Sequence, residues 1–228
     1  GGAGFIGSNF IHYMLDIYDD IEIVNYDKLT YAGNLDNLLD AENDSRYHFV
    51  KGDICDEEMV EKTVKEHDVS QIVNFAAESH VDRSISGPKN FINTDVWGAF
   101  SLVEANSMLY LSKYIQISTD EVYGSIQDGS FREGDPLNPS SPYSASKASA
   151  DLLVNSYFVT YGLPVMITRS TNNFGPYQYP EKLIPLFIIK AWRDESLPVY
   201  GDGMQVRDWL YVDDNCHAVD LVRKKGRP

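Results

Sequence analysis

The feature that most restricts what this chain can fold into is its beginning, GGAGFIG, which runs directly into a helical pattern. Gly2, Gly4 and Gly7 have the spacing G-x-G-x-x-G. Gly1 with the last two gives the alternative spacing G-x-x-G-x-x-G. Glycines so placed permit a tight turn and let the backbone approach a pyrophosphate, whose charge a helix N-terminus stabilises. The motif alone is weak, because a purely structural glycine turn has the same pattern.

An acidic residue strengthens the interpretation as a dinucleotide site. Asp27 ends the strand candidate IEIVNY and follows Gly7 by 20 residues, the position at which a carboxylate hydrogen-bonds an adenosine ribose. A carboxylate there repels a 2′-phosphate, so the sequence favours NAD over NADP, although the adjacent Lys28 offers a positive charge. Asp53, at the end of the next strand candidate, is placed where an adenine edge can lie, or it is a plain turn former.

Strand candidates alternate with amphipathic helical patterns along the chain. The β-rich runs are IEIVNY, YHFV, QIVNFA, YIQIS and PVMITRS. Helices are predicted over residues 8–18, from Asp56 onward, after Pro88, and over residues 144–161. This alternation predicts an α/β protein with a doubly wound parallel sheet, a Rossmann-like fold.

Two domains are expected. Residues 1–171 are predicted to form the nucleotide-binding domain, whose first strand we expect to precede the glycine loop. Residues 172–228, richer in Pro, Gly and aromatic side chains, are predicted to form mainly a smaller substrate-binding region, incomplete at its C-terminal end.

Composition argues against several kinds of partner. The formal net charge is −15 and no cluster of Lys or Arg is evident, which disfavours nucleic acid and anionic membranes. No apolar run is long enough to span a bilayer. Cys55 and Cys216 lie far apart and outside any C-x-x-C spacing, so neither a disulfide framework nor a metal site is predicted. We therefore expect a cytoplasmic protein that uses no metal.

A tyrosine and a lysine mark a possible reaction centre. Tyr143 and Lys147 stand four residues apart at the start of a helical pattern, so they share one face. An ammonium group favours a nearby phenolate, so the spacing predicts a lowered pKa for Tyr143 and a role as base. A surface pair is the alternative. With the glycine motif and Asp27, the pair favours hydride-transfer chemistry, in which Thr119 or Ser118 orients a substrate hydroxyl.

Two adjacent carboxylates, Asp120 and Glu121, follow the strand candidate YIQIS. Like charges side by side are costly when partly buried, so a solvated loop is one interpretation. The other is an acid and a base held over one substrate, because neighbouring carboxyl groups push each other's ionisation apart. The sequence leaves open which of the two is the acid.

Seven segments together resemble the extended short-chain dehydrogenase/reductases, and within them the nucleotide-sugar 4,6-dehydratases. They are GGAGFIGSNF, YDKLTYAGNLDNL, FAAESHVDRS, STDEVYG, PYSASKA, NNFGPYQYPEKLIP and PVYGDGMQVRDWLYVDD, which cover essentially the whole chain. Several are shared with nucleotide-sugar epimerases and decarboxylases. The run Thr119, Asp120, Glu121 is the element specific to dehydratases.

The resemblance implies a lyase that dehydrates dTDP-glucose to dTDP-4-keto-6-deoxyglucose and recycles NAD. In it Tyr143, supported by Lys147 and Thr119, removes the proton of the C4 hydroxyl as hydride goes to NAD. Glu121 then takes the C5 proton, Asp120 protonates the departing C6 hydroxyl, and hydride returns to C6.

The resemblance also implies binding residues. Those expected to contact NAD are Gly1, Gly4, Phe5, Ile6, Gly7, Asp27, Lys28, Leu29, Thr30, Asp53, Ile54, Ala76, Ala77, Ser79, Thr94, Tyr143, Lys147 and Asn173. Those expected to contact the sugar nucleotide are His80, Thr119, Asn172, Lys182, Leu183, Pro198, Tyr200 and Arg207. A homodimer through the helices after Pro88 and Ser144 is expected. The alternatives are a nucleotide-sugar 4-epimerase or decarboxylase, or a non-catalytic NAD-sensing module on the same fold.

Overall fold

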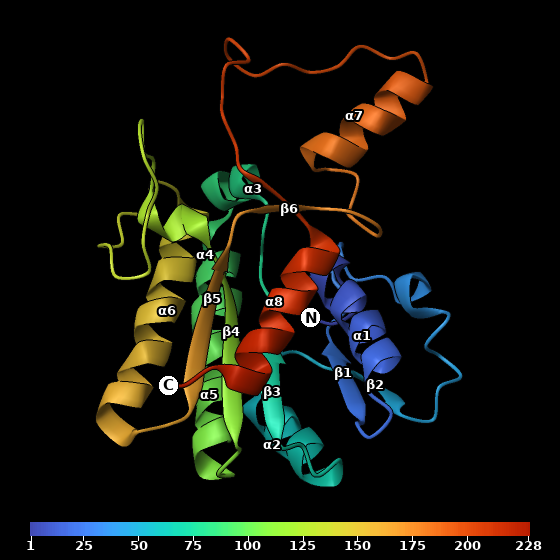
Figure 1. Cartoon of the computed structure of the whole chain (residues 1–228), viewed down its shortest axis with the longest axis vertical. Coiled ribbons are helices and arrows are strands. Elements are labelled where there is room, and N and C mark those ends of the chain that lie inside the picture. Colours follow the sequence, from blue (N-terminus) through green and yellow to red (C-terminus); the bar gives the residue numbers. More distant parts are fainter.

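Parallel strands form the centre of the protein, which a computed structural model describes over residues 1–228 (Figure 1). One sheet pairs β1 (Ile23–Asp27) with β2 (Tyr47–Lys51). A second has the order β3 (Gln71–Asn74), β4 (Lys113–Thr119), β5 (Val165–Ser170). All five β-rich runs of the sequence are therefore strands, and the predicted parallel α/β arrangement is confirmed.

Helices cover both faces of the strands, as the doubly wound prediction requires. On one face α5 (Gly98–Met108) and α6 (Pro142–Tyr161) contact β4, and α2 (Glu57–Glu66) packs on α5. On the other, α1 (Phe5–Ile17) and α8 (Val212–Lys225) pack together (Figure 1).

Strand β4 is buried on both of its faces. Its consecutive residues Tyr114 and Ile115 are both fully buried. Because side chains alternate along a strand, the two enter different cores. Tyr114 joins the core under α5 and α6 with Val154, whereas Ile115 joins the core under α1 and α8 with Val212. The catalytic candidates at the end of β4 thus stand on the most rigidly packed strand.

The two sheets adjoin at their edge strands β1 and β3, which are not hydrogen-bonded to one another. A cavity of about 600 Å³ lies between them, lined by residues of α1, β1, α2 and β3 and of the segments that precede β1 and β3.

The N-cap residues explain where three of the predicted helices begin. The first helix begins at Phe5, earlier than predicted, because Gly4 already serves as its N-cap. Asp56 caps α2 as predicted, and its Oδ1 accepts the Met59 N–H at 3.0 Å. Ser141 and Ser144 form a capping box, so α6 begins two residues before the predicted start.

The predicted long helix after Pro88 is interrupted. It consists of α4 (Pro88–Phe91), a π-helical turn η2 (Ile92–Trp97) and α5. Single π-helical turns of this kind are found frequently at functional sites.

Residues 172–228 lie partly against the core and partly away from it. The strands β6 (Asn172–Phe174) and β7 (Trp209–Tyr211) pair in parallel. Helix α7 (Leu183–Trp192) and the segment 193–207 stand away from the sheets, whereas α8 returns to the core beside α1 (Figure 1). The short elements are η1 (Leu35–Leu38), α3 (Val81–Ser86) and η3 (Asp120–Tyr123). The domain boundary near residue 171 stays a prediction.

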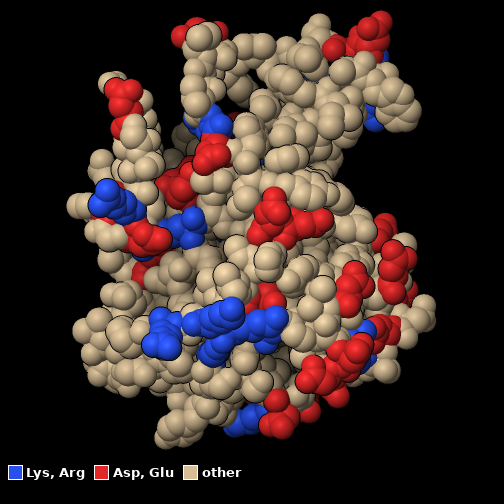
Figure 2. Space-filling view, viewed as in Figure 1, with Lys and Arg blue, Asp and Glu red and all other residues tan.

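Charge is unevenly spread on the surface. Acidic side chains are scattered over the face seen in Figure 2, and basic ones gather in one band at the C-terminal end of α8, whose last turn carries Arg223, Lys224 and Lys225. None of the helices combines the length and apolar character needed to cross a bilayer.

Candidate active site

The glycine turn lies against the end of β3 and opens into α1. A Cβ atom on Gly7 would lie 2.4 Å from the carbonyl oxygen of Gly1, and one on Gly1 would lie 2.3 Å from the nitrogen of Ala76. Neither position can hold a side chain. Gly4 provides no side-chain cap, so the first N–H groups of α1 are available to a bound anion.

Asp27 connects this turn to the loop after β1. One oxygen of its buried carboxylate accepts the Ala3 N–H at 2.9 Å, and the other accepts the Leu29 N–H at 2.7 Å. Each oxygen retains a second acceptor site, which suits the hydroxyl groups of a ribose.

Lys28 is held by another carboxylate. Its Nζ lies 2.6 Å from Oδ2 of Asp53, and this hydrogen bond raises the pKa of Lys28. Its charge is therefore engaged within the protein, and the residues around Asp27 fit NAD better than NADP.

Asp27→Asn is expected to weaken NAD binding about 10-fold or more, because hydrogen bonds to a charged group contribute about 1.5–3 kcal/mol each. A calorimetric titration with NAD measures the change. The matched control is Asp36→Asn, an exposed carboxylate on η1 whose loss is expected to leave NAD affinity unaltered. Equal affinities for the Asp27 variant and the wild type would contradict the assignment.

Two of the binding residues expected from the sequence carry a buried polar atom that has no partner within the chain. The atoms are Oδ1 of Asn173 and Nδ1 of His80. An unpaired buried polar atom costs about 1–3 kcal/mol, so a ligand that pairs with it is favoured. Together with the glycine turn and Asp27, these atoms fit a bound dinucleotide and its sugar-nucleotide partner.

Thr119 contacts both acidic residues at the end of β4, the carboxylate of Asp120 and the backbone of Glu121. Its Oγ1 donates to Oδ1 of Asp120 and accepts the N–H of Glu121, both at 3.2 Å. One hydroxyl thus caps η3 and orients both acidic residues. Burial raises the pKa of Asp120. Burial and the charge of Asp120 raise the pKa of Glu121, while Lys182 and Arg207 oppose that rise.

Tyr143 and Lys147 lie on α6 as predicted, with a different electrostatic effect. Lys147 is buried, and its Nζ donates to the carbonyl oxygen of Ile117 at 2.7 Å. The pKa of Tyr143 is raised, first by burial and then by the charges of Glu121 and Asp95. The expected lowering by Lys147 is therefore wrong, because burial and neighbouring carboxylates outweigh a lysine that is bound to a carbonyl oxygen.

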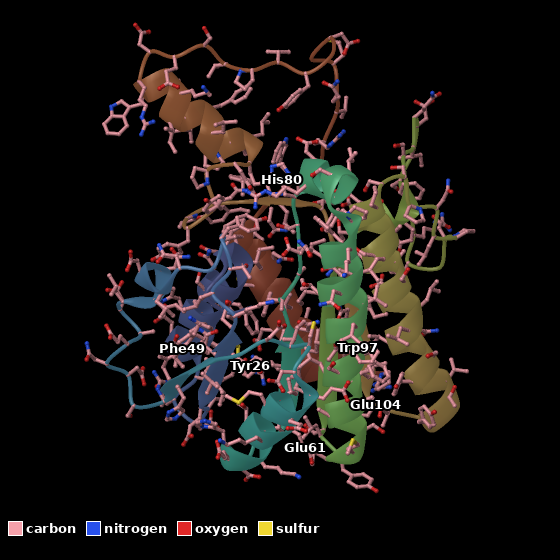
Figure 3. The ribbon with its side chains drawn as sticks, turned by 180° about the vertical axis from the view of Figure 1, so that it is seen from behind. Tyr26, Phe49, Glu61, His80, Trp97 and Glu104 are labelled. Carbon is pink, nitrogen blue, oxygen red and sulfur yellow. The ribbon has the colours of Figure 1, made fainter.

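The substrate-side residues come from three segments. His80 precedes α3 at the end of the molecule that faces α7 (Figure 3), and its Nε2 lies 3.6 Å from Oε2 of Glu181. Lys182 donates from Nζ to the carbonyl oxygen of Ser79 at 2.8 Å, and burial lowers its pKa. These contacts bring Glu181 and Lys182 beside Ser79 and His80, which lie on the segment that follows β3.

Four other residues that the sequence assigns to binding differ in how close they lie to the site. Arg207 lies near enough to Glu121 to lower that residue's pKa. Pro198 and Tyr200 lie on the segment that stands away from the sheets, and Tyr200 is 74% exposed. Ile54 is buried in the core under α5 rather than on an open surface.

The remaining expected residues occupy the ends of strands and the starts of helices around the site. They are Phe5 and Ile6 in the first turn of α1, Thr30 after β1, Ala77 after β3, Thr94 on η2, Asn172 on β6 and Leu183 at the start of α7.

Comparison with known proteins decides the family. Residues 1–228 match the family described as GDP-mannose 4,6 dehydratase. The chain belongs to this dehydratase family.

Individual relatives of this dehydratase agree. The low-salt glycan biosynthesis protein Agl12 of Haloferax volcanii is 57% identical over 99% of this chain and 72% of its own length. The dTDP-glucose 4,6-dehydratase of Xanthomonas campestris is 51% identical over 100% of this chain and 67% of its own length. The crystal structure of DesIV, the dTDP-glucose 4,6-dehydratase of Streptomyces venezuelae, with NAD bound, superimposes with a TM-score of 0.96 at 49% identity, covering 100% of this chain and 71% of that one. The resemblance found in the sequence is confirmed.

A buried carboxylate and a partly buried one beside the site of this dehydratase were not found by sequence reasoning. Asp95 is 2% exposed on η2, and Glu181 contacts His80, Arg83 and Tyr31. The signal for Asp95 was a single acidic residue in the otherwise uncharged stretch FINTDVWGAF. Glu181 follows Tyr179 and Pro180 in a loop, and the residues around it show no periodic pattern from which its contacts could be predicted.

Proposed function

We propose that this protein dehydrates dTDP-glucose to dTDP-4-keto-6-deoxyglucose with NAD as a recycled cofactor. The observation that carries the proposal is the pair Asp120 and Glu121, which Thr119 orients within electrostatic range of Tyr143. Relatives named dTDP-glucose 4,6-dehydratase, from 46 to 51% identical over the whole chain, support the substrate. NAD, when bound, accepts hydride from C4 and returns it to C6.

The chain's own residues move the protons. Tyr143 removes the proton of the C4 hydroxyl, which Thr119 helps to orient. The resulting 4-keto group acidifies the C5 proton, which Glu121 takes during elimination and gives back to C5 when hydride enters C6. Asp120 donates a proton to the C6 hydroxyl, so that it leaves as water. A raised pKa favours the protonated form of Asp120, and burial produces this shift.

Positive side chains supply the contacts for the diphosphate. Arg207 is exposed, and its guanidinium group can bind two phosphate oxygens at once. Lys182 faces the same region, since both residues lower the pKa of Glu121. We assign the diphosphate to Arg207 and Lys182.

Incubation of the protein with dTDP-glucose and, separately, UDP-glucose tests the function. The expected product, identified by NMR, is a 4-keto-6-deoxy sugar, formed faster from dTDP-glucose. A galactose isomer would contradict dehydration and favour a 4-epimerase, which uses Tyr143 and Lys147 and has no use for Asp120. Absence of any turnover with bound NAD would favour the non-catalytic module.

A homodimer in the cytoplasm completes the proposal. Large apolar side chains are exposed along the outer helices, among them Trp97 (Figure 3), Leu152 and Val159. Covering them with the same face of a second copy gives a symmetric interface. Light scattering after size exclusion tests the dimer. Cys55 and Cys216 are free thiols, as is usual in a reducing compartment.

A further inference from the structure

A buried carboxylate lies behind the catalytic face of α6. Asp95 is 2% exposed and lies on η2, the π-helical turn between α4 and α5. Phe91, just before this turn, contacts the ring of Tyr143 edge to face with 6.3 Å between ring centroids. The residue that precedes the π-helical turn therefore packs against Tyr143, the residue proposed to act on the C4 hydroxyl.

Asp95 bonds two segments that carry the reaction centre. Its Oδ1 accepts the N–H of Glu78 at 2.9 Å, on the segment between β3 and α3. Its Oδ2 accepts the hydroxyl of Ser146 at 2.6 Å, on α6 between Tyr143 and Lys147. The side chain thus joins the base-bearing helix to the segment expected to line the nicotinamide.

The charge of Asp95 does not itself help the base. The charged and titratable groups around it are Glu78, Lys147 and Tyr143. Burial raises the pKa of Asp95 to about 6, with Lys147 acting in the opposite direction. When ionised, Asp95 raises the pKa of Tyr143 and so opposes its deprotonation. Any benefit to catalysis must therefore come from geometry.

We propose that Asp95 is a positioning residue that fixes Tyr143 on α6 relative to the segment after β3. The inference rests on the proposed function, because it concerns the C4 oxidation that begins the dehydration. Its two hydrogen bonds set the separation of these elements, and a displacement of about 1 Å in such a site can cost about 100-fold in rate.

An amide can replace the carboxylate at this position. In Asp95→Asn, Oδ1 can still accept the Glu78 N–H. The Nδ2 group can donate to Oγ of Ser146, whose own hydrogen is then free for the carbonyl oxygen of Tyr143, 2.8 Å away. In Asp95→Ala both bonds are lost, and the partly buried N–H of Glu78 loses its acceptor.

The test measures single-turnover C4 oxidation of dTDP-glucose by the absorbance of reduced nicotinamide, together with KM and kcat. Asp95→Ala is expected to lower kcat about 10- to 100-fold with little change in KM. Asp95→Asn is expected to remain within about 3-fold of the wild type, and to shift the pH profile of oxidation to lower pH because one anion near Tyr143 is removed. Ser146→Ala, which keeps one of the two bonds, is expected to lie between them.

A control separates positioning from stability. Asp220→Ala removes another buried carboxylate, which lies on α8 and accepts a hydrogen bond of 2.7 Å from the Tyr18 hydroxyl. It is expected to lower the melting temperature while leaving kcat of the folded protein unchanged. If Asp95→Ala does not fold, Ser146→Ala and Asp95→Asn still decide the matter.

Each outcome has a distinct meaning. An Asp95→Ala protein that oxidises C4 as fast as the wild type would overturn the inference alone. An Asp95→Asn protein that is folded but severely slowed would also overturn it, because charge would then matter more than geometry. A wild-type protein that forms no 4-keto-6-deoxy sugar would overturn the proposed function itself.

Discussion

Replacement of Asp120 by Asn together with Glu121 by Gln is expected to leave C4 oxidation intact and to slow water elimination by about 10²- to 10⁴-fold for each lost proton transfer. Oxidation needs Tyr143, which both substitutions leave in place, whereas elimination needs an acid and a base. Reduced nicotinamide, followed by its absorbance, should accumulate while the 4-keto-6-deoxy sugar fails to appear by NMR.

The control for this double variant is Asp128→Asn. Asp128 is an exposed carboxylate in the loop after η3, so its neutralisation changes local charge without touching the site. Full dehydration by the double variant would sink the assignment of Asp120 and Glu121.

The single variants separate the acid from the base. If Glu121 is the base, Glu121→Gln should stop exchange of the C5 proton with deuterated water. Asp120→Asn should permit that exchange and stall departure of the C6 hydroxyl. The raised pKa values of both residues do not distinguish the roles, so the exchange experiment is decisive.

Tyr143→Phe is expected to slow C4 oxidation by about 10²- to 10⁴-fold, because it removes the proton acceptor. The ring and its contact with Phe91 remain, so affinities for NAD and dTDP-glucose should change little. In the wild type, burial raises the pKa of Tyr143, so the deprotonated fraction and the oxidation rate should increase as pH rises.

Single-turnover measurements across a pH series test both statements. Tyr161→Phe, at the exposed end of α6, serves as the control and should keep the wild-type rate. Oxidation at the wild-type rate by Tyr143→Phe would exclude Tyr143 as the base.

Local chemistry explains why much of the fold was predictable. Short β-rich runs predicted every strand of the two main sheets. Asp56, a residue type that favours the N-cap position, predicted the start of α2. The interruption of the helix after Pro88 was not predictable, because the apolar pattern continues through the π-helical turn.

The site was predictable where neighbours in sequence make it. Thr119, Asp120 and Glu121 contact one another within three residues. The pKa direction of Tyr143 was wrong, because its burial and the nearby Asp95 depend on the fold. Asp95 itself was missed because its partners lie 17 and 51 residues away along the chain.

The adjacency of Asp120 and Glu121 on one short turn has a stereochemical consequence. Asp120 and Glu121 are adjacent in a single turn at the end of β4. If these two residues are the acid and the base, we expect proton and hydroxyl to leave from one face of the C5–C6 bond. A stereospecifically labelled C6 group would record this as syn geometry in the product.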